Sequence, residues 1–186
     1  ARGRSAQQFG DMLGADTDFQ NGTATISKGL FPDEIMAAID CGNSGTTARL
    51  LCGLVAGSTA RATLFGDDSL SNRPMSRVIK PLQKLGAEIN GGPTLPMTVS
   101  GVVQSGKVEM EIASAQVKSA LLLTGKDIEL TNCGGSRDHT ERLLKLMGAD
   151  IKWDEDSVQL KQSKLRPFEI TVPGDPSSAA FFLCAS

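Results

Sequence analysis

Aromatic residues are scarce in this chain: Phe, Trp and Tyr together make up 4% of its 186 residues, and tyrosine is absent. Stacking platforms for single-stranded nucleic acid need several aromatic rings, so the composition argues against them. A surplus of basic residues is lacking too, because 19 Lys and Arg stand against 21 Asp and Glu, for a formal net charge of −2. We therefore expect no nucleic-acid partner, and any cationic site must be local.

Cysteine and histidine are too sparse for several kinds of site. The four cysteines, Cys41, Cys52, Cys133 and Cys184, have neither CxxC spacing nor the density of a disulfide scaffold. We expect reduced and mostly buried thiols in a cytoplasmic protein. His139 is the only histidine, which disfavours cysteine–histidine catalysis because such a nucleophile needs a base beside it.

Long apolar runs are absent as well. None approaches the roughly 20 residues of a membrane span, and residues 1–5 lack the apolar core of a signal peptide. We expect no membrane partner. The chain has no initiator Met and stops at 181–186, inside what reads as an apolar helix. We interpret it as a fragment, although its 40% hydrophobic content is enough for a core.

What the chain does have is a repeat. A Gly-Ala motif followed by Asp or Glu ends the segments 12–16, 84–88 and 147–150, roughly 60 to 70 residues apart, as in repeated supersecondary units. Each copy closes an amphipathic stretch, at 5–13, 76–85 and 140–147, and its glycine suits a helix C-cap. Two short strand-like runs follow, such as 151–154 and 158–161, which predict a hairpin.

A second landmark repeats in the same order. Small polar residues open apolar helices at 43–51, 113–122 and 174–182, and strands are predicted next at 62–65 and 127–130. The predicted fold is α/β, with repeated helix, strand-pair, helix and strand units in pseudo-threefold packing. We expect alanine-rich helices such as 119–123 to be buried and mixed sheets to lie outside them.

The first of these helix starts reads as an anion-binding site. Residues 43–46 are small and polar, and they would leave unpaired N–H groups at the positive end of the helix dipole. Arg49 and Arg73 could add bidentate contacts to the same anion. Equivalent starts in a pseudo-threefold arrangement could converge at one end of the domain. The alternative is an ordinary set of capped helices with a loop arginine.

Five segments resemble, in order, the motifs of the enolpyruvyl transferase family, specifically the 5-enolpyruvylshikimate-3-phosphate synthases of bacterial type: 42–49, 66–75, 113–121, 136–142 and 172–181. The resemblance covers nearly the whole chain. It implies a two-domain α/β enzyme in which each domain is built from three similar units. Residues 1–172 would form a single substrate-binding domain, most of the enzyme's first domain, residues 173–186 a truncated helix at its end, and the second domain would be absent.

The resemblance also implies the reaction. The family transfers the enolpyruvyl group of phosphoenolpyruvate to the 5-hydroxyl of shikimate 3-phosphate, releases phosphate, and uses no metal or redox cofactor. The family's amino-terminal Lys-Ser…Arg segment is absent here, as is the second domain, which carries the acid/base carboxylates and lysines. We therefore expect this chain to bind both small-molecule substrates, to need the missing second domain as its partner, and to be inactive alone.

Site residues follow from the motif match. Phosphoenolpyruvate would contact Asn43, Gly45, Arg73 and Gln116, and shikimate 3-phosphate would contact Ser114, Ala115, Gln116 and Ser136. Arg49, Arg137 and His139 are further candidates. Alternatives stay open for several: Arg49 could pair with Asp67 or Asp68, 137–139 could be a solvated helix start, and Lys118 reads as a snorkelling side chain.

Two other functions compete. The sister enzyme, which transfers enolpyruvyl to UDP-N-acetylglucosamine, carries a reactive cysteine in the loop before the Arg-Pro pair. Residues 66–73 contain no cysteine, and Asp68 lies about where the thiol is expected, which favours the shikimate branch. The other alternative is a non-catalytic repeat module that binds a partner through an open face.

Overall fold

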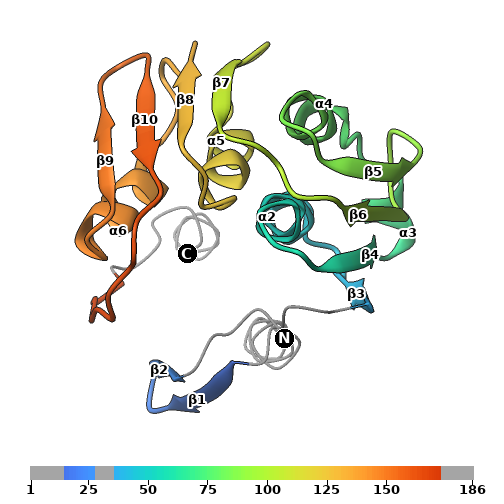
Figure 1. The fold of residues 1–186 in the computed structure, drawn as a ribbon. Coiled ribbons are helices and arrows are strands. Elements are labelled where there is room, and N and C mark those ends of the chain that lie inside the picture. Colours follow the sequence, from blue (N-terminus) through green and yellow to red (C-terminus); the bar gives the residue numbers. More distant parts are fainter. Residues whose placement is uncertain (1–14, 28–35, 173–186) are drawn as a thin grey trace, which may run out of the picture.

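Two four-stranded sheets of the same design dominate the computed structural model, which describes residues 15–27 and 36–172 (Figure 1). The strand orders are β3-β4-β6-β5 and β7-β8-β10-β9. In each sheet the first pair is parallel and the other two pairs are antiparallel. The strands are β3 (Met36–Asp40), β4 (Arg61–Phe65), β5 (Glu88–Gly91), β6 (Met97–Ser100), β7 (Gly106–Glu109), β8 (Ile128–Thr131), β9 (Asp150–Trp153) and β10 (Val158–Lys161).

The helices repeat in step with the sheets. In both units a first helix joins the parallel strands, and a second helix leads into the antiparallel pair. The first helices are α2 (Gly45–Ala56) and α5 (Ala115–Leu122), and the second are α4 (Ser76–Lys84) and α6 (His139–Leu146). A short α3 (Asp68–Ser71) precedes α4. The α/β repeat predicted from the sequence is confirmed for two successive units.

A third hairpin follows the first Gly-Ala motif. Strands β1 (Asp16–Gln20) and β2 (Thr23–Ser27) pair antiparallel around Asn21 and Gly22, whose φ values of 50° and 80° suit a two-residue hairpin turn. Hairpins therefore follow all three motifs. Gly86 and Gly148 have φ of 102° and 87°, in agreement with their predicted role after a helix end.

The predicted bounds need small corrections. The strands expected at 62–65 and 127–130 are β4 and β8, and Asp127 lies before β8, where its carboxylate accepts the N–H of Gln162 at 2.7 Å. The helix expected from 113 begins at Ala115. The predicted helices at 5–13 and 173–186 lie outside the described residues.

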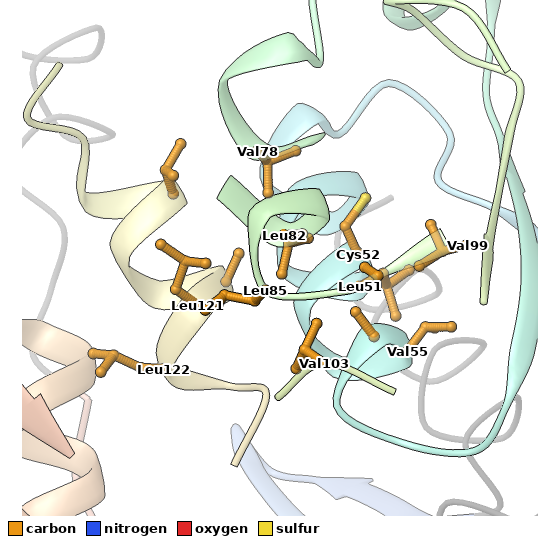
Figure 2. Packing of buried hydrophobic residues seen from close by; sticks show 14 of the residues in the cluster. Leu51, Cys52, Val55, Val78, Leu82, Leu85, Val99, Val103, Leu121 and Leu122 are labelled. Atoms are coloured by element: carbon orange, nitrogen blue, oxygen red, sulfur yellow. The ribbon is translucent and has the colours of Figure 1, made fainter. Parts of the chain in front are cut away.

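The core lies between the sheets, where α2 and α5 pack together (Figure 1). Glycines let the two backbones approach: a Cβ on Gly53 would lie 1.8 Å from Ala120 O, and one on Gly57 would lie 2.2 Å from Thr124 O. Figure 2 shows part of the apolar cluster around them, including Leu51 of α2 and Leu121 of α5. Buried helices with outer sheets are thus confirmed.

The cysteines of the described part belong to this interior. Cys41, Cys52 and Cys133 are free and buried, as predicted, whereas Cys184 lies outside the described residues. Burial raises the pKa of Cys52 to about 12 and, with a contribution from Asp40, that of Cys41 to about 11. Within residues 15–27 and 36–172, every helix is too short or too polar to cross a membrane.

Candidate active site

The first turn of α2 offers backbone donors at the positive end of the helix. Ser44 caps the helix: its Oγ accepts the Thr47 N–H at 3.2 Å, and its carbonyl accepts the Ala48 N–H at 3.1 Å. The N–H groups of Gly45 and Thr46 have no partner within the helix, as expected for a first turn. No acidic residue occupies that turn, so the dipole there is open to an external anion.

Gly45 faces two arginine side chains. A Cβ added at this position would lie 2.9 Å from Nη1 of Arg49 and 3.7 Å from Nη1 of Arg73. Glycine therefore lets both guanidinium groups lie close to the helix start. This is the geometry expected where backbone and arginine forks act on one anion.

Arg73 reaches the site from the loop between α3 and α4. It donates from Nη2 to Asn43 Oδ1 at 2.6 Å and to Ser69 Oγ at 3.2 Å, and from Nη1 to Asn43 O at 3.3 Å. The Asn43 amide in turn donates to Asp67 Oδ2 at 2.7 Å. This bond, together with the Leu70 N–H, holds the pKa of Asp67 below its usual 3.8. Asn43 therefore orients Arg73.

Arg49 has different partners from those considered in the sequence. It donates from Nη1 to Gln116 Oε1 at 2.8 Å and from Nη2 to Pro74 O at 3.1 Å. The alternative of an ion pair with Asp67 or Asp68 is wrong. Burial, followed by the like charges of Arg77 and Arg73, lowers the pKa of Arg49. The positive charges of Arg73 and Arg77 therefore act on Arg49, and an anion bound beside Arg49 would offset them.

Gln116 joins the two helix starts. Besides accepting from Arg49, it donates from Nε2 to Thr46 Oγ1 at 2.9 Å. The first turns of α2 and α5 therefore meet, as the repeat predicted. The third predicted helix start, at 174–182, lies outside the described residues.

The start of α5 has no side-chain cap. Ser114 is the N-cap residue in extended conformation, and its carbonyl accepts the Lys118 N–H at 2.9 Å, but its hydroxyl makes no capping hydrogen bond. The side chain therefore caps the helix at Ser44 and not at Ser114. Ser114, Ala115 and Gln116 are all partly exposed, so this helix start is accessible.

Ser136 lies in the loop between β8 and α6. Its hydroxyl donates to Cys133 O at 2.7 Å, and its N–H donates to the same carbonyl at 3.2 Å. The hydroxyl proton is therefore used within the loop, and a phosphate at this position would have to draw it away. An open hollow of about 600 Å³ lies beside the loop, with Ser136, Lys118 and Trp153 among its lining residues.

Lys118 corrects a second prediction. Its side chain is 3% exposed and its Nζ lies 2.5 Å from Oε1 of Glu141, which is 0% exposed. It is therefore a buried ion-pair partner, and the predicted snorkelling position is wrong. Sequence reasoning missed Glu141. A usable signal was present, because Glu141 precedes Leu144 on the buried side of α6 while Lys118 is the only charged residue of α5.

Arg137 and His139 are both exposed at the start of α6. The adjacent Asp138 accepts from Arg142 Nε at 2.9 Å, and this bond lowers the pKa of Asp138. The solvated helix start anticipated for this segment is confirmed, and a ligand role for Arg137 or His139 stays a prediction. A smaller cavity of about 40 Å³, between α4 and residues 109–112, contains none of the predicted site residues.

Comparison with known proteins gives one consistent family. The family model described as EPSP synthase (3-phosphoshikimate 1-carboxyvinyltransferase) matches residues 5–186. A relative from Bacillus licheniformis, named 3-phosphoshikimate 1-carboxyvinyltransferase, is 42% identical over 179 residues, covering 90% of this chain and 42% of the relative. One of the same name from Thermodesulfovibrio yellowstonii is 49% identical over 158 residues, covering 80% of this chain and 37% of the relative.

A solved structure agrees with these matches. EPSP synthase from Acinetobacter baumannii superimposes with a TM-score of 0.86 at 36% identity, covering 97% of this chain and 43% of that protein. The chain thus spans less than half the length of the relatives that it matches.

Proposed function

The chain belongs to the EPSP synthase family, and from this premise we propose that its two converging helix starts bind phosphoenolpyruvate and shikimate 3-phosphate. The site would be one half of an active site that transfers the enolpyruvyl group to the 5-hydroxyl of shikimate 3-phosphate. The observation that carries the proposal is the position of Gln116, which bonds Arg49 at 2.8 Å and Thr46 at 2.9 Å. Polar side chains of both repeats therefore meet at Gln116.

The phosphoenolpyruvate half is assigned to α2 and to the loop before α4. Gly45 contributes a backbone N–H and, because it has no Cβ, lets Arg49 and Arg73 lie close to the helix start. A guanidinium fork matches a carboxylate or phosphate with two parallel hydrogen bonds. Asn43, bonded to Arg73 at 2.6 Å, keeps this fork oriented before the substrate arrives, which lowers the entropic cost of binding.

The shikimate 3-phosphate half is assigned to 114–116 and Ser136. The Ser114 hydroxyl makes no bond to its own helix, so it is available to a ligand. Ala115 and Gln116 occupy the positive end of α5, where anions are stabilised. Arg137 and His139 flank this half at the start of α6.

The proposed reaction brings several negatively charged groups together, so the site must supply positive charge. The 5-hydroxyl gives up its proton to a base as its oxygen bonds to C2 of phosphoenolpyruvate, while C3 takes up a proton from an acid. The resulting tetrahedral intermediate then loses phosphate from C2 and a proton from C3, which restores the double bond. Arginines and helix ends balance the anions and hold the two reactants together. We assign residues 1–172 to the substrate-binding domain and the proton-transferring groups to a second domain. The chain alone should then bind without turnover.

Calorimetry tests the binding. Titration with shikimate 3-phosphate should give a saturable heat that weakens with salt, because the contacts are ionic. The heat should disappear in Ser114→Ala/Gln116→Ala and persist in the control Gln159→Ala, which alters an exposed residue of β10. No heat from the parent chain at millimolar ligand would contradict the proposal and favour a non-catalytic binding module.

Phosphate release tests the absence of turnover. With both substrates present, the pure chain should release phosphate at the background rate. Steady-state release above background would show that the groups needed for proton transfer are already in this chain.

The sister reaction is the second candidate. The absence of cysteine from 66–73 argues against it, and a parallel titration with UDP-N-acetylglucosamine should give no heat. We also propose a cytoplasmic location, which the three buried free thiols support.

A further inference from the structure

We propose that the buried Lys118–Glu141 ion pair positions the shikimate 3-phosphate half of the site by holding the Ser136 loop against α5. The inference rests on the proposed function for its effect on binding. Whether the ion pair holds the Ser136 loop in place can be tested without ligand.

One ammonium group joins three segments of the chain. Lys118 lies on α5, four residues after Ser114. Its Nζ lies 2.5 Å from Glu141 Oε1 on α6 and 3.5 Å from the carbonyl oxygen of Ser136 in the intervening loop. The helix that carries the predicted ligands at 114–116 is thereby linked to the loop that carries Ser136.

Stability alone is a poor explanation for the pair. Lys118 is 3% exposed and Glu141 is 0% exposed, so both charges are removed from water. No other donor among the described residues reaches either carboxylate oxygen of Glu141. The desolvation of two charges generally costs as much as their attraction returns, and an apolar pair of similar volume often stabilises a core equally well. A contact to Ser136 O is what an apolar pair could not make.

The loop needs this contact on one side. On the other side, the tip of the β9–β10 hairpin holds it: Cys133 N–H donates to Asp156 O at 2.9 Å, and Gly134 N–H donates to Asp156 Oδ1 at 3.1 Å. The bonds from Ser136 to Cys133 O are internal to the loop. Lys118 therefore supplies a link between Ser136 and the helix that presents the other half of the ligand set.

Lys118 is a positioning residue in this account. It lines the hollow beside Ser136, but its charge is already paired with Glu141 at 2.5 Å. A substrate phosphate would have to compete with that buried carboxylate. The effect on ligand is thus transmitted through Ser136.

The test replaces the pair by apolar residues in the full chain, as Lys118→Leu/Glu141→Leu. Removing both charges avoids an unpaired buried charge, and Ser119 Oγ remains bonded to Thr140 Oγ1 at 2.7 Å between α5 and α6. Three quantities are measured: the melting temperature, hydrogen exchange of peptides covering 133–138 and 128–131, and affinity for each substrate. Ser119→Ala is the matched control, since it removes a polar α5–α6 contact that does not involve the Ser136 loop.

The expected result separates positioning from stability. The melting temperature should stay within a few degrees of the parent, while exchange in 133–138 accelerates about tenfold and exchange in 128–131 is unchanged. Affinity for shikimate 3-phosphate should fall about tenfold, with phosphoenolpyruvate affinity within about twofold. Parent-like exchange in 133–138 with parent-like shikimate 3-phosphate affinity would overturn the inference.

Two further outcomes are decisive. If both the double leucine variant and Lys118→Met/Glu141→Gln lose exchange protection throughout the chain, the pair is a folding requirement and the inference fails. If the parent chain gives no heat with shikimate 3-phosphate, the proposed function fails. Exchange in 133–138 then still decides whether Lys118 holds the loop.

Discussion

Arg49 Nη1 lies 2.8 Å from Gln116 Oε1, and this hydrogen bond joins α2 to α5 through two residues that are 67 positions apart in the chain. A charged donor on α2 is thus held by a neutral acceptor on α5, and the pair connects the first helices of two repeats. The bond explains how two similar units can form one site. It also makes a measurable link between the stability of the domain and the geometry of the site.

The Arg49–Gln116 bond should appear as a coupling energy. Urea unfolding of the parent, Arg49→Ala, Gln116→Ala and the double variant should give an interaction of about 1 kcal/mol, because hydrogen bonds to charged groups contribute at least this much when partly shielded. Losses of unfolding free energy that simply add would show that the two side chains do not stabilise each other.

Gly45→Ala should weaken phosphoenolpyruvate binding about tenfold with little change in stability. The new methyl group would lie 2.9 Å from Arg49 Nη1, and the flexible end of the arginine can move away, but the space for the anion is reduced. Calorimetry and thermal melting measure the two effects. Gly92→Ala is the control, because a Cβ there meets nothing within 4 Å. Unchanged affinity in Gly45→Ala would place the phosphoenolpyruvate site elsewhere.

Gly53→Ala should destabilise the core by about 3 kcal/mol, at the upper end of the usual cost of overpacking. The added Cβ would lie 1.8 Å from Ala120 O, and a backbone atom cannot move without separating α2 from α5. Urea unfolding measures the loss, with Gly92→Ala again expected to change little. A loss below about 0.5 kcal/mol, typical of neutral surface changes, would mean that the helices are not in backbone contact.

Asp67 should make stability fall on acidification. Its pKa lies below the usual 3.8 because the Asn43 amide and the Leu70 N–H bond the ionised form. Its contribution is therefore present above the pKa of the unfolded chain and is lost as pH falls through the lower folded value. The difference in urea midpoint between parent and Asp67→Asn should shrink from pH 6 toward pH 2. A difference in urea midpoint that does not change with pH would refute the assignment.

The buried thiols should be unreactive in the folded chain. Burial raises the pKa of Cys52 to about 12 and that of Cys41 to about 11, so thiolate is scarce near pH 8 and access is blocked. In Cys184→Ser, which leaves the three described thiols, a disulfide reagent should react at least about a hundredfold more slowly before unfolding than after it in urea. Rapid reaction of all three in the native chain would contradict their burial.

The repeat and the ends of its helices could be predicted from the sequence because they depend on local properties. Gly86 and Gly148 end helices with φ of 102° and 87°, a conformation that other residues rarely adopt. Alternating apolar residues specified the β9–β10 hairpin, and the apolar character of 119–123 specified a buried helix. The helix start at 43–46 was predicted for the same reason, since the capping bond joins Ser44 to Thr47, only three residues away.

Partners across the fold could not be predicted in this way. From the sequence, Asp67 and Asp68 were candidate ion-pair partners of Arg49. In the structure Arg49 instead donates hydrogen bonds to Gln116 and Pro74. Distance along the chain says little about which side chain fills a space between packed helices. The same limit applies to hydroxyl groups: Ser44 and Ser114 look alike as caps, yet only the Ser44 side chain makes the capping bond.

By itself the sequence determined the α/β repeat, the family and the small residues at each helix start. Periodicity, turn residues and motif order depend only on residues that are close together in the chain, so they can be recognised without the fold. Tertiary structure decided how these starts are joined. The close approach of α2 and α5 at Gly53 brings Gln116 within hydrogen-bond distance of Arg49. Because Lys118 is buried, its ammonium group pairs with the carboxylate of Glu141. Both outcomes arise from packing, since a polar group removed from water must find its partner among whatever residues the fold brings near.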